Sequence, residues 1–420
     1  MDDASPNAFQ TLRLAQWRQF SSVELEFHDR LTTLTGANAS GKTTLLNILG
    51  SHFRWPAQFL GVPLTRPGGP VLWRSDTVWR PEPLTEQHTN HAIGEIVYSV
   101  GGAELKSSPL IVPEIAQTYG VLIPNQVFVP GLFVASHRSL SAYESLASIP
   151  LQFSASSSFL DEFIGVVRSR WDGGGGNPLW SIKSALIAAA IFGEGNSAVS
   201  PDHEAWEIWT GFQDVLRAVL PPSLGFEALT VRRPDLVFQT RSTEFLLEAM
   251  SGGMSAIVEL AWQIFLQSRQ YDAFTVCIDE PENHLHPELQ RSILPGLLKA
   301  FPHIRFIVAT HSPFVVTSVR ESNVYVLEGD DTGVSSRLLE HISKSTGADE
   351  TLRRVLGMET TFPLWVEREL DEVLSSIPTR GPSPDDISRL KDALIKAGLA
   401  SEYPAAVDAL LRDDSDATSE

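Results

Sequence analysis

The sequence predicts an α/β protein with a mixed and parallel sheet and flanking helices. Two short apolar segments, residues 274–278 and 305–309, are bounded by polar residues, which is typical of buried strands in a parallel sheet. A third strand over residues 31–35 is followed by a glycine-containing loop and by an apolar helix face at 45–49. Strand, loop and helix in this order form one βα unit of an α/β fold.

Further strands are predicted on both sides of these segments. Residues 23–27 alternate with period two, and 91–100 and 127–135 read as strands. Residues 55–90 are rich in Pro and Gly, which favours an irregular connection with short strands. Strand patterns return over residues 225–248, and 324–327 is the last strand that we predict.

Three helices are predicted over residues 158–170, 179–192 and 203–220, with glycine-rich breaks between them. We interpret them as a helical insertion lobe. The chain then divides into an N-terminal lobe (1–154), the insertion lobe (155–222), the rest of the core (223–336) and a helical C-terminal extension (337–420). The extension ends in an acidic tail at 413–420, for which we expect disorder.

Composition restricts the class of protein. The single cysteine, Cys277, excludes a disulfide framework within the chain. The first residues lack the pattern of a secretory signal, and no apolar run approaches the roughly 20 residues of a membrane span. We therefore expect a cytoplasmic protein with no membrane contact.

The formal net charge of −19 argues against a broad nucleic-acid-binding surface, because phosphates are attracted to positive faces. A local basic groove stays open as an alternative. Arg168 with Arg170, or Arg232 with Arg233, are candidates for it, although such pairs usually lie on a solvated face. DNA contact is therefore possible but not supported by the net charge.

The loop after residues 31–35 reads G-A-N-A-S-G-K-T-T and matches the phosphate-binding pattern G-x-x-x-x-G-K-[ST]. Lys42 would reach the β- and γ-phosphates, and the Thr43 hydroxyl would ligate Mg²⁺. The predicted cofactors are ATP and Mg²⁺. The predicted ATP-binding residues of this loop are Gly36, Ala37, Asn38, Ala39, Ser40, Gly41, Lys42, Thr43 and Thr44.

Two adjacent carboxylates, Asp279 and Glu280, follow the apolar segment 274–278. At the end of a buried strand such a pair is costly unless a cation or a water molecule uses it. Asp279 would hold Mg²⁺, and Glu280 would act as general base toward the attacking water. His311 follows the next buried segment, where a ring nitrogen would sense the γ-phosphate.

Ser251-Gly252-Gly253-Met254 precedes an apolar helix. Ser251 is a good N-cap, so the simplest interpretation is a capped helix with a glycine-rich start. The same residues can also bind phosphate at a helix N-terminus. A second phosphate site on the same chain would imply a dimer.

The ordered set GANASGKTT, MSGGM, CIDEPENHLHP and VATHSP resembles the ABC-type ATPase heads of the SMC, Rad50, RecF and OLD branch over residues 10–330. That resemblance implies a two-lobed α/β head that encloses two ATPs between two subunits. Ser251, Gly252 and Gly253 would be the signature that contacts the partner's ATP. Asp279 and Glu280 would be Walker B, and His311 the switch histidine.

Other positions follow from the same resemblance. Residues 282–284 occupy the D-loop position, and W-R-Q-F at 17–20 is similar to the N-F-[RK]-x-F segment, which would bring Arg18 near the nucleotide. For the Q-loop residue, Gln126 is one candidate, and the segment Ser136-His137-Arg138 lies nearer the expected strand end. Met254 departs from the family pattern, which has a polar residue there.

Residues 133–139 and 347–357 resemble the ATPase subunits of bacterial anti-phage systems, and the Septu type is the nearest. In that family the ATPase works with an HNH nuclease. The leading interpretation is an ATP-hydrolysing AAA or ABC ATPase that forms a homodimer or higher oligomer on ATP and regulates a separate effector such as a nuclease. One alternative is a RecF-like DNA repair clamp, and another is the nucleotide-binding subunit of a transporter.

Overall fold

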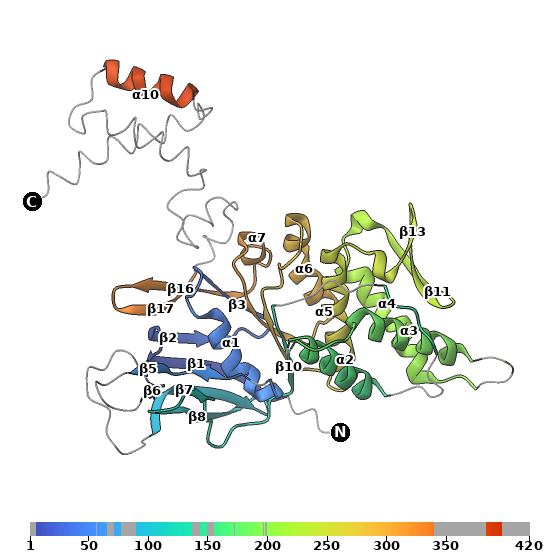
Figure 1. Ribbon diagram of the computed structural model, residues 1–420, viewed down its shortest axis with the longest axis horizontal. Coiled ribbons are helices and arrows are strands. Elements are labelled where there is room, and N and C mark those ends of the chain that lie inside the picture. Colours follow the sequence, from blue (N-terminus) through green and yellow to red (C-terminus); the bar gives the residue numbers. More distant parts are fainter. Residues whose placement is uncertain are drawn as a thin grey trace, which may run out of the picture. The chain divides into compact units, whose positions relative to one another are not determined.

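The computed structural model is drawn in Figure 1. It describes residues 6–55, 57–64, 71–76, 90–136, 143–148, 155–171, 173–195, 197, 200–339 and 384–396. The chain divides into two units, Met1–Gly357 and Met358–Glu420. The second unit is described over the helix α10 (Pro384–Lys396), which lies within the predicted helical extension. The predicted acidic tail lies outside the described residues.

A ten-stranded sheet organises the first unit, with the order β10-β14-β15-β3-β16-β17-β2-β1-β7-β8. Its first five strands in this order pair in parallel, and β1, β2, β7 and β8 pair antiparallel, so the predicted mixed sheet is confirmed. The strands are β1 (Ala8–Trp17), β2 (Phe20–Glu26), β3 (Leu31–Gly36), β7 (Asn90–Val100), β8 (Glu104–Pro113), β10 (Gly131–Val134), β14 (Thr275–Asp279), β15 (Arg305–Ala309), β16 (Asn323–Asp330) and β17 (Gly333–Leu338).

Smaller sheets lie beside the large one. In one, β11 (Phe226–Arg232), β12 (Asp235–Thr240) and β13 (Glu244–Leu246) form an antiparallel meander. The short strands β4 (Phe59–Leu60) and β9 (Thr118–Tyr119) pair with each other, as do β5 (Val62–Leu64) and β6 (Leu72–Arg74). The strands β4, β5 and β6 fall in the Pro- and Gly-rich connection, as predicted, whereas β9 was not predicted.

In the large sheet, β8 and β17 were not predicted. The first half of β8 is exposed and polar, so it lacks the alternation by which a half-buried strand is recognised. The prediction that 324–327 is the last strand is wrong, because β17 follows it and pairs with both β16 and β2. The predicted boundary at residue 336 therefore falls inside β17.

Helices cover both faces of the parallel part of the sheet. Successive residues of a strand point to opposite faces, so each strand contributes side chains to a core on both sides. Cys277 and Ile307 contribute to a core with α1 (Lys42–Gly50). Their neighbours Ile278 and Val308 contribute to the other core, on the far face. That face carries α2 (Ser156–Trp171), α3 (Pro178–Glu194), α4 (His203–Val219), α5 (Gly252–Ser268) and α6 (Pro287–Ala300), so the three helices expected in the insertion lobe are present.

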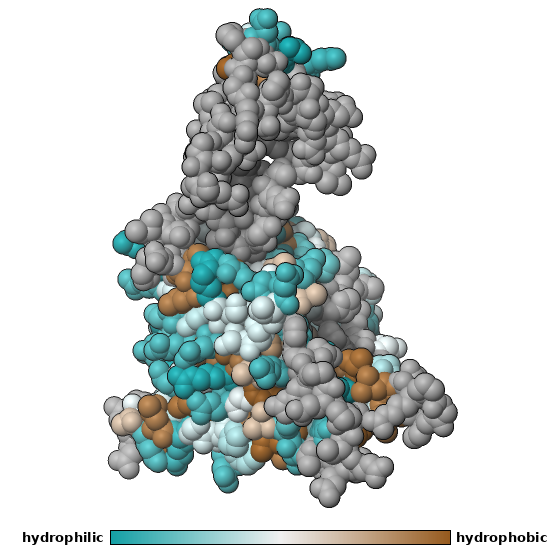
Figure 2. All heavy atoms as spheres, turned by 90° about the vertical axis from the view of Figure 1, so that its left-hand side faces the viewer, coloured by the Kyte–Doolittle hydropathy of each residue, from teal (hydrophilic) through white to brown (hydrophobic). Residues whose placement is uncertain are grey.

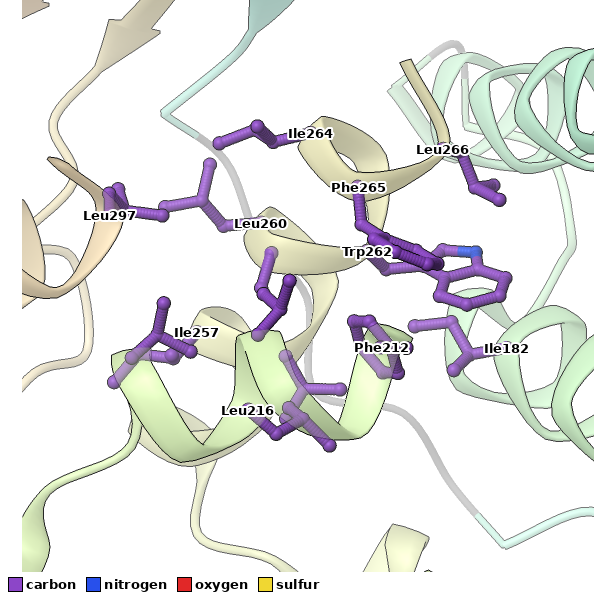
Figure 3. Close-up of a cluster of buried hydrophobic side chains, with 14 of the residues drawn as sticks. Ile182, Phe212, Leu216, Ile257, Leu260, Trp262, Ile264, Phe265, Leu266 and Leu297 are labelled. Atoms are coloured by element: carbon purple, nitrogen blue, oxygen red, sulfur yellow. The ribbon is translucent and has the colours of Figure 1, made fainter. Parts of the chain in front are cut away.

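The insertion helices share a core with α5. Figure 3 shows Phe212 of α4 and Ile182 of α3 beside Trp262 of α5, and the rings of Phe212 and Trp262 meet edge to face at 4.8 Å. All three side chains are fully buried. The lobe is thus packed against the helix that follows Ser251.

The visible face in Figure 2 is mostly hydrophilic, and hydrophobic residues there form small separate areas. Small scattered apolar areas are normal for a protein surface in water. Of the helices that the structure describes, none combines the length and the apolar character that crossing a membrane requires.

Candidate functional site

The glycine-containing loop joins the end of β3 to the start of α1, in the middle of the sheet. Gly41 has a φ of 98°, which a residue with a side chain rarely adopts. A Cβ at this position would also lie 2.4 Å from the ring of Phe20. Only glycine therefore fits at the point where the loop continues into the helix. The first N–H groups of an α-helix have no partner within the helix, so those of α1 can bind an anion.

Lys42 lies beneath this loop and is almost completely buried. Its ammonium group donates hydrogen bonds to the carbonyl oxygens of Gly36 and Ala37, both at 3.0 Å. Burial lowers the pKa of Lys42 to about 8, against the attraction of Glu280 and Asp279. A buried cation held by neutral carbonyls is ready to exchange them for an anion.

Thr43 connects the loop to the end of β14. Its hydroxyl lies 3.2 and 3.0 Å from the two carboxylate oxygens of Asp279 and donates to that carboxylate. Burial raises the pKa of Asp279 to about 6, although the hydrogen bond from Thr43 lowers it. An alcohol and a carboxylate in contact form the all-oxygen donor set that Mg²⁺ prefers.

Glu280 leaves the strand with a φ of 48°, while its N–H donates to the carbonyl of Ala309 at 2.8 Å. Asn283 donates to the Glu280 carboxylate at 2.8 Å, and the His311 ring nitrogen lies 3.8 Å from it. Burial and the charge of Lys42 lower the pKa of His311. A left-handed non-glycine residue is strained, and here the turn directs the carboxylate toward the loop.

Glu282 holds the segment that carries His311. One of its carboxylate oxygens accepts from the Thr310 hydroxyl at 2.7 Å and from the His311 N–H at 2.7 Å. The N–H of Ser312 donates to the same oxygen at 3.2 Å, and the Ser312 hydroxyl donates to Gln290 at 2.6 Å. Since these bonds join the ends of β14 and β15, the position of His311 depends on Glu282.

A cavity of about 430 Å³ opens beside Thr43, Asp279 and Glu280. Ser136, at the end of β10, also lines it, and the Ser136 carbonyl accepts a hydrogen bond from Asn283 at 3.0 Å. Gln126 is not among the lining residues that the structure describes. The remaining wall includes Asn47, Trp55, Ala57, Gln58, Phe133, Ala135 and, from the insertion lobe, Arg168.

The predicted signature lies at the start of α5. The Ser251 hydroxyl accepts a hydrogen bond from the Met254 N–H at 3.4 Å, so Ser251 is the N-cap of the helix. A Cβ on Gly253 would lie 2.6 Å from the carbonyl oxygen of His284, so glycine is required for this close approach. The segment thus packs against the predicted D-loop, whereas Ser251 itself is exposed.

Arg18 lies in the turn between β1 and β2 with a φ of 51°. Its guanidinium donates to the carbonyl of Leu60 at 3.2 Å and lies 5.7 Å from the centre of the Phe59 ring. The next residue, Gln19, is 2.5 Å from where a Gly41 Cβ would be. The turn therefore lies against the phosphate-binding loop, and Gln19 is the residue of the turn that is closest to Gly41.

The structure brings Lys42, Thr43, Asp279, Glu280 and His311 together at the carboxyl ends of β3, β14 and β15. It also places Asn283 and Glu282 there with specific contacts, which the sequence suggested only by their D-loop position. Ser251 is the exception, because its hydroxyl accepts a hydrogen bond from Met254 in its own helix turn. Gln290 gave no signal in the sequence, since it acts through Ser312, which only the fold brings to it. Arg168 was considered in the sequence only for a basic groove, whereas the structure places it in the wall of the cavity.

Two family models match the chain. One, described as "AAA domain", matches residues 11–51, and the other, described as "AAA domain, putative AbiEii toxin, Type IV TA system", matches residues 236–317. The first segment contains Lys42 and Thr43, and the second contains Asp279, Glu280 and His311. The chain is therefore matched at both halves of the site, and the predicted AAA ATPase domain is confirmed.

Curated proteins of similar sequence indicate which kinds of ATPase this chain resembles. "Retron Ec83 probable ATPase" of Escherichia coli is 32% identical over 127 residues, which are 28% of this chain and 23% of the relative. "Septu protein PtuA" of Bacillus mycoides is 38% identical over 86 residues, 19% of this chain and 12% of the relative. The chain is related to the Septu and retron ATPases. This confirms the resemblance to the Septu type.

The relationship covers parts of these proteins only. "Septu protein PtuA" of Bacillus thuringiensis is 24% identical over 166 residues, which are 36% of this chain and 42% of the relative. The chain thus spans less than half the length of the curated relatives named here. Among solved structures, the SMC head domain from Thermotoga maritima aligns over 79% of this chain and 99% of its own, with 14% identity and a TM-score of 0.42.

Proposed function

We propose that the chain binds Mg²⁺-ATP at the edge formed by β3, β14 and β15 and hydrolyses it to ADP and phosphate. One observation carries this proposal. The Thr43 hydroxyl contacts Asp279 at 3.0 Å, while the adjacent Glu280 is held by Asn283 and faces His311. A phosphate-binding loop, an oxygen donor set for a divalent cation and an oriented carboxylate are the parts that phosphoryl transfer to water needs.

Each residue then has a definite role. Lys42 would exchange its carbonyl partners for the β- and γ-phosphate oxygens, and Thr43 and Asp279 would hold Mg²⁺. The metal neutralises charge on the phosphates when it is bound. Glu280 takes a proton from water as the water oxygen attacks the γ-phosphorus and the bond to the β–γ bridging oxygen breaks.

The second part of the proposal is that two copies of the chain enclose two ATPs. The exposed Ser251 and the glycines after it lie at a helix N-terminus, which favours an anion. Because the Ser251 hydroxyl is exposed and bonds to Met254 of its own helix turn, it would act on the ATP of a second copy. Nucleotide state would then control a population switch between monomer and dimer.

The third part concerns the output. We propose that the dimer regulates a separate effector, such as a nuclease, in bacterial anti-phage defence within the cytoplasm. Relationship to Septu and retron ATPases supports this role. The net charge of −19 also favours a protein partner over bare DNA.

The decisive experiment uses Glu280→Gln, which keeps the shape of the side chain and removes the base. With Mg²⁺-ATP this variant should bind ATP, turn over on the order of 10²-fold more slowly, and elute as a stable dimer. Glu104→Gln, an exposed glutamate on β8, is the matched control and should behave as the unchanged chain. Normal turnover by Glu280→Gln would exclude Glu280 as the base, and a monomer in Mg²⁺-ATP would exclude the ATP-enclosing dimer.

The effector is tested separately. The tagged chain is purified from its host with Mg²⁺-ATP, and the proteins that come with it in equal amounts are identified by mass spectrometry. A stoichiometric nuclease or toxin-like protein supports the proposal. Recovery with DNA and repair proteins, and without such a partner, would favour the repair clamp instead.

A further inference from the structure

Lys183, on α3 of the insertion lobe, is a fully buried lysine outside the candidate site. Its side chain has no exposed surface. The ammonium group forms ion pairs with Asp235 at 3.3 Å and with Glu248, and it donates to the carbonyl oxygen of Glu144. The Tyr143 ring lies 5.0 Å from it. The ammonium group therefore donates hydrogen bonds to Asp235 and Glu144 and forms an ion pair with Glu248.

Glu248 depends on this lysine. Its side chain is only 2% exposed, and neither of its carboxylate oxygens has a hydrogen-bond partner in the part of the chain that the structure describes. The ion pair with Lys183 is the contact that compensates its charge. A buried carboxylate without compensation must take up a proton or move toward water, so removal of the lysine would displace Glu248.

Glu248 lies immediately before the predicted signature. It belongs to the short 3-10 helix η3 (Leu247–Ala249), and Ser251 follows two residues after this helix ends. Two contacts fix η3: the fully buried Leu247 side chain and the ion pair of Glu248 with Lys183. The direction in which the chain enters α5 therefore depends on Glu248.

The body of α5 is fixed independently. Figure 3 shows Ile257, Leu260 and Trp262 packed among buried side chains of neighbouring helices. In the first turn, two amides bond to Ser251, the N-cap that follows η3. The Met254 N–H donates to the Ser251 hydroxyl at 3.4 Å, and the Ser255 N–H donates to the Ser251 carbonyl at 3.0 Å. A shift of η3 would therefore break the hydrogen bonds of this first turn before those in the rest of α5.

The other partners of Lys183 extend the connection. Glu144 lies eight residues after Ser136, which lines the cavity beside Thr43 and accepts a hydrogen bond from Asn283. Asp235 is the first residue of β12, in the sheet that leads to η3. Lys183 therefore joins the insertion lobe, the chain beyond the catalytic end of β10 and the entry to α5.

We propose that Lys183 is a positioning residue for the signature: by pairing with Glu248 it fixes η3 and thereby the orientation of Ser251. The local part of this inference concerns one chain without nucleotide. Its consequence for assembly rests on the proposed ATP-enclosing dimer, so the two are measured separately.

The test uses Lys183→Met, which keeps the length of the side chain and removes its charge. Hydrogen exchange of the full chain without nucleotide should become at least tenfold faster at the amides of Met254 and Ser255. Exchange in α1, where the Leu45 N–H donates to Gly41 at 3.1 Å, should not change. If Lys183→Met does not fold, Glu248→Gln removes only the pair with η3 and should give the same local change.

Arg30→Met is the matched control. Arg30 is a half-buried cation that donates to the carbonyls of Leu298, Phe301 and Ile304. Its loss should lower the stability of the whole unit without the local change at Met254 and Ser255. Unchanged exchange at these two amides in Lys183→Met and Glu248→Gln, or the same pattern in all three variants, would overturn the proposal.

Assembly is the second readout. In a Glu280→Gln background with Mg²⁺-ATP, Lys183→Met should weaken dimerisation at least tenfold and change the ATP affinity of the monomer less than twofold. If Lys183→Met speeds exchange at Met254 and Ser255 but dimerises as strongly as the Glu280→Gln chain alone, the proposal that Lys183 positions Ser251 for dimerisation is overturned. A Glu280→Gln chain that never dimerises would overturn the proposed dimer, and the exchange result would still decide the role of Lys183.

Discussion

The candidate nucleotide edge and the signature segment differ in how completely one chain builds them. At the nucleotide edge, Thr43 contacts Asp279 at 3.0 Å and Asn283 holds Glu280 at 2.8 Å, so the side chains orient one another. At the signature, the Ser251 hydroxyl bonds only within its own helix turn, and the residue is exposed. Each chain thus contains one group of polar side chains that contact one another and, separately, one exposed helix start.

This difference predicts two classes of variant. Changes at the nucleotide edge should act on a single chain, because the contacts are all internal. Changes at the signature should leave a single chain intact and act only where a second copy is needed. The following predictions test this division.

The largest effect is expected for Lys42→Ala. The phosphates would lose a buried charge-assisted partner, which is worth roughly 2–5 kcal/mol, so ATP affinity should fall by up to about 10³-fold. Isothermal titration with Mg²⁺-ATP measures this, and circular dichroism should show an unchanged fold. Lys299→Ala, an exposed lysine on α6, is the control. Unchanged ATP affinity of Lys42→Ala would contradict the nucleotide site itself.

Ser251→Arg should abolish ATP-dependent dimerisation, weakening it at least about 10²-fold, because a long cation would occupy the space of the partner's phosphate and a cap would be lost. Monomer affinity for ATP should stay within twofold of the unchanged chain. Light scattering in a Glu280→Gln background with Mg²⁺-ATP measures the first quantity. A dimer of normal strength would remove the distinction drawn above.

Glu282→Gln tests whether the hydrogen bonds of Glu282 hold His311 in place beside Glu280. The amide cannot accept three hydrogen bonds with the strength of a carboxylate, and the loss of about 2 kcal/mol would free His311 to move. We expect kcat to fall about 30-fold with little change in KM. An equal fall in ATP affinity would show that Glu282 organises binding rather than the chemical step.

Much of the nucleotide edge could be predicted because its residues follow strand ends in a fixed order. Lys42 and Thr43 lie in a recognisable loop, and Asp279 and His311 each follow an apolar strand. Lys183 could not be found in this way, because a lysine in a helical pattern is normally on the surface and its partners are at distant positions. The β8 strand was missed for a related reason, since its polar residues lie on an exposed half.

The smallest expected effect is a loss of stability at low pH, and it arises from His52 in the core that packs against α1. His52 lies under the end of this helix, with one ring nitrogen 2.8 Å from the Tyr98 hydroxyl and the other 3.0 Å from the Leu49 carbonyl. Burial lowers the pKa of His52 to about 4, below its ordinary 6.5. The stability from the neutral ring is therefore complete above pH 6.5 and is lost as the pH falls toward 4.

At pH 5.5 the unfolded chain holds this proton and the folded chain does not, so about 1.4 kcal/mol of unfolding free energy should be lost relative to pH 7.5. Urea unfolding at both pH values measures it. In His52→Gln this part of the pH dependence should vanish, whereas His203→Gln, with a side chain that is 84% exposed, should retain it. At pH 5.5 the protection factors for hydrogen exchange, which are corrected for the slower intrinsic exchange at this pH, should then fall in α1 before α5, because the titrating group is packed under the nucleotide side and not under the signature helix.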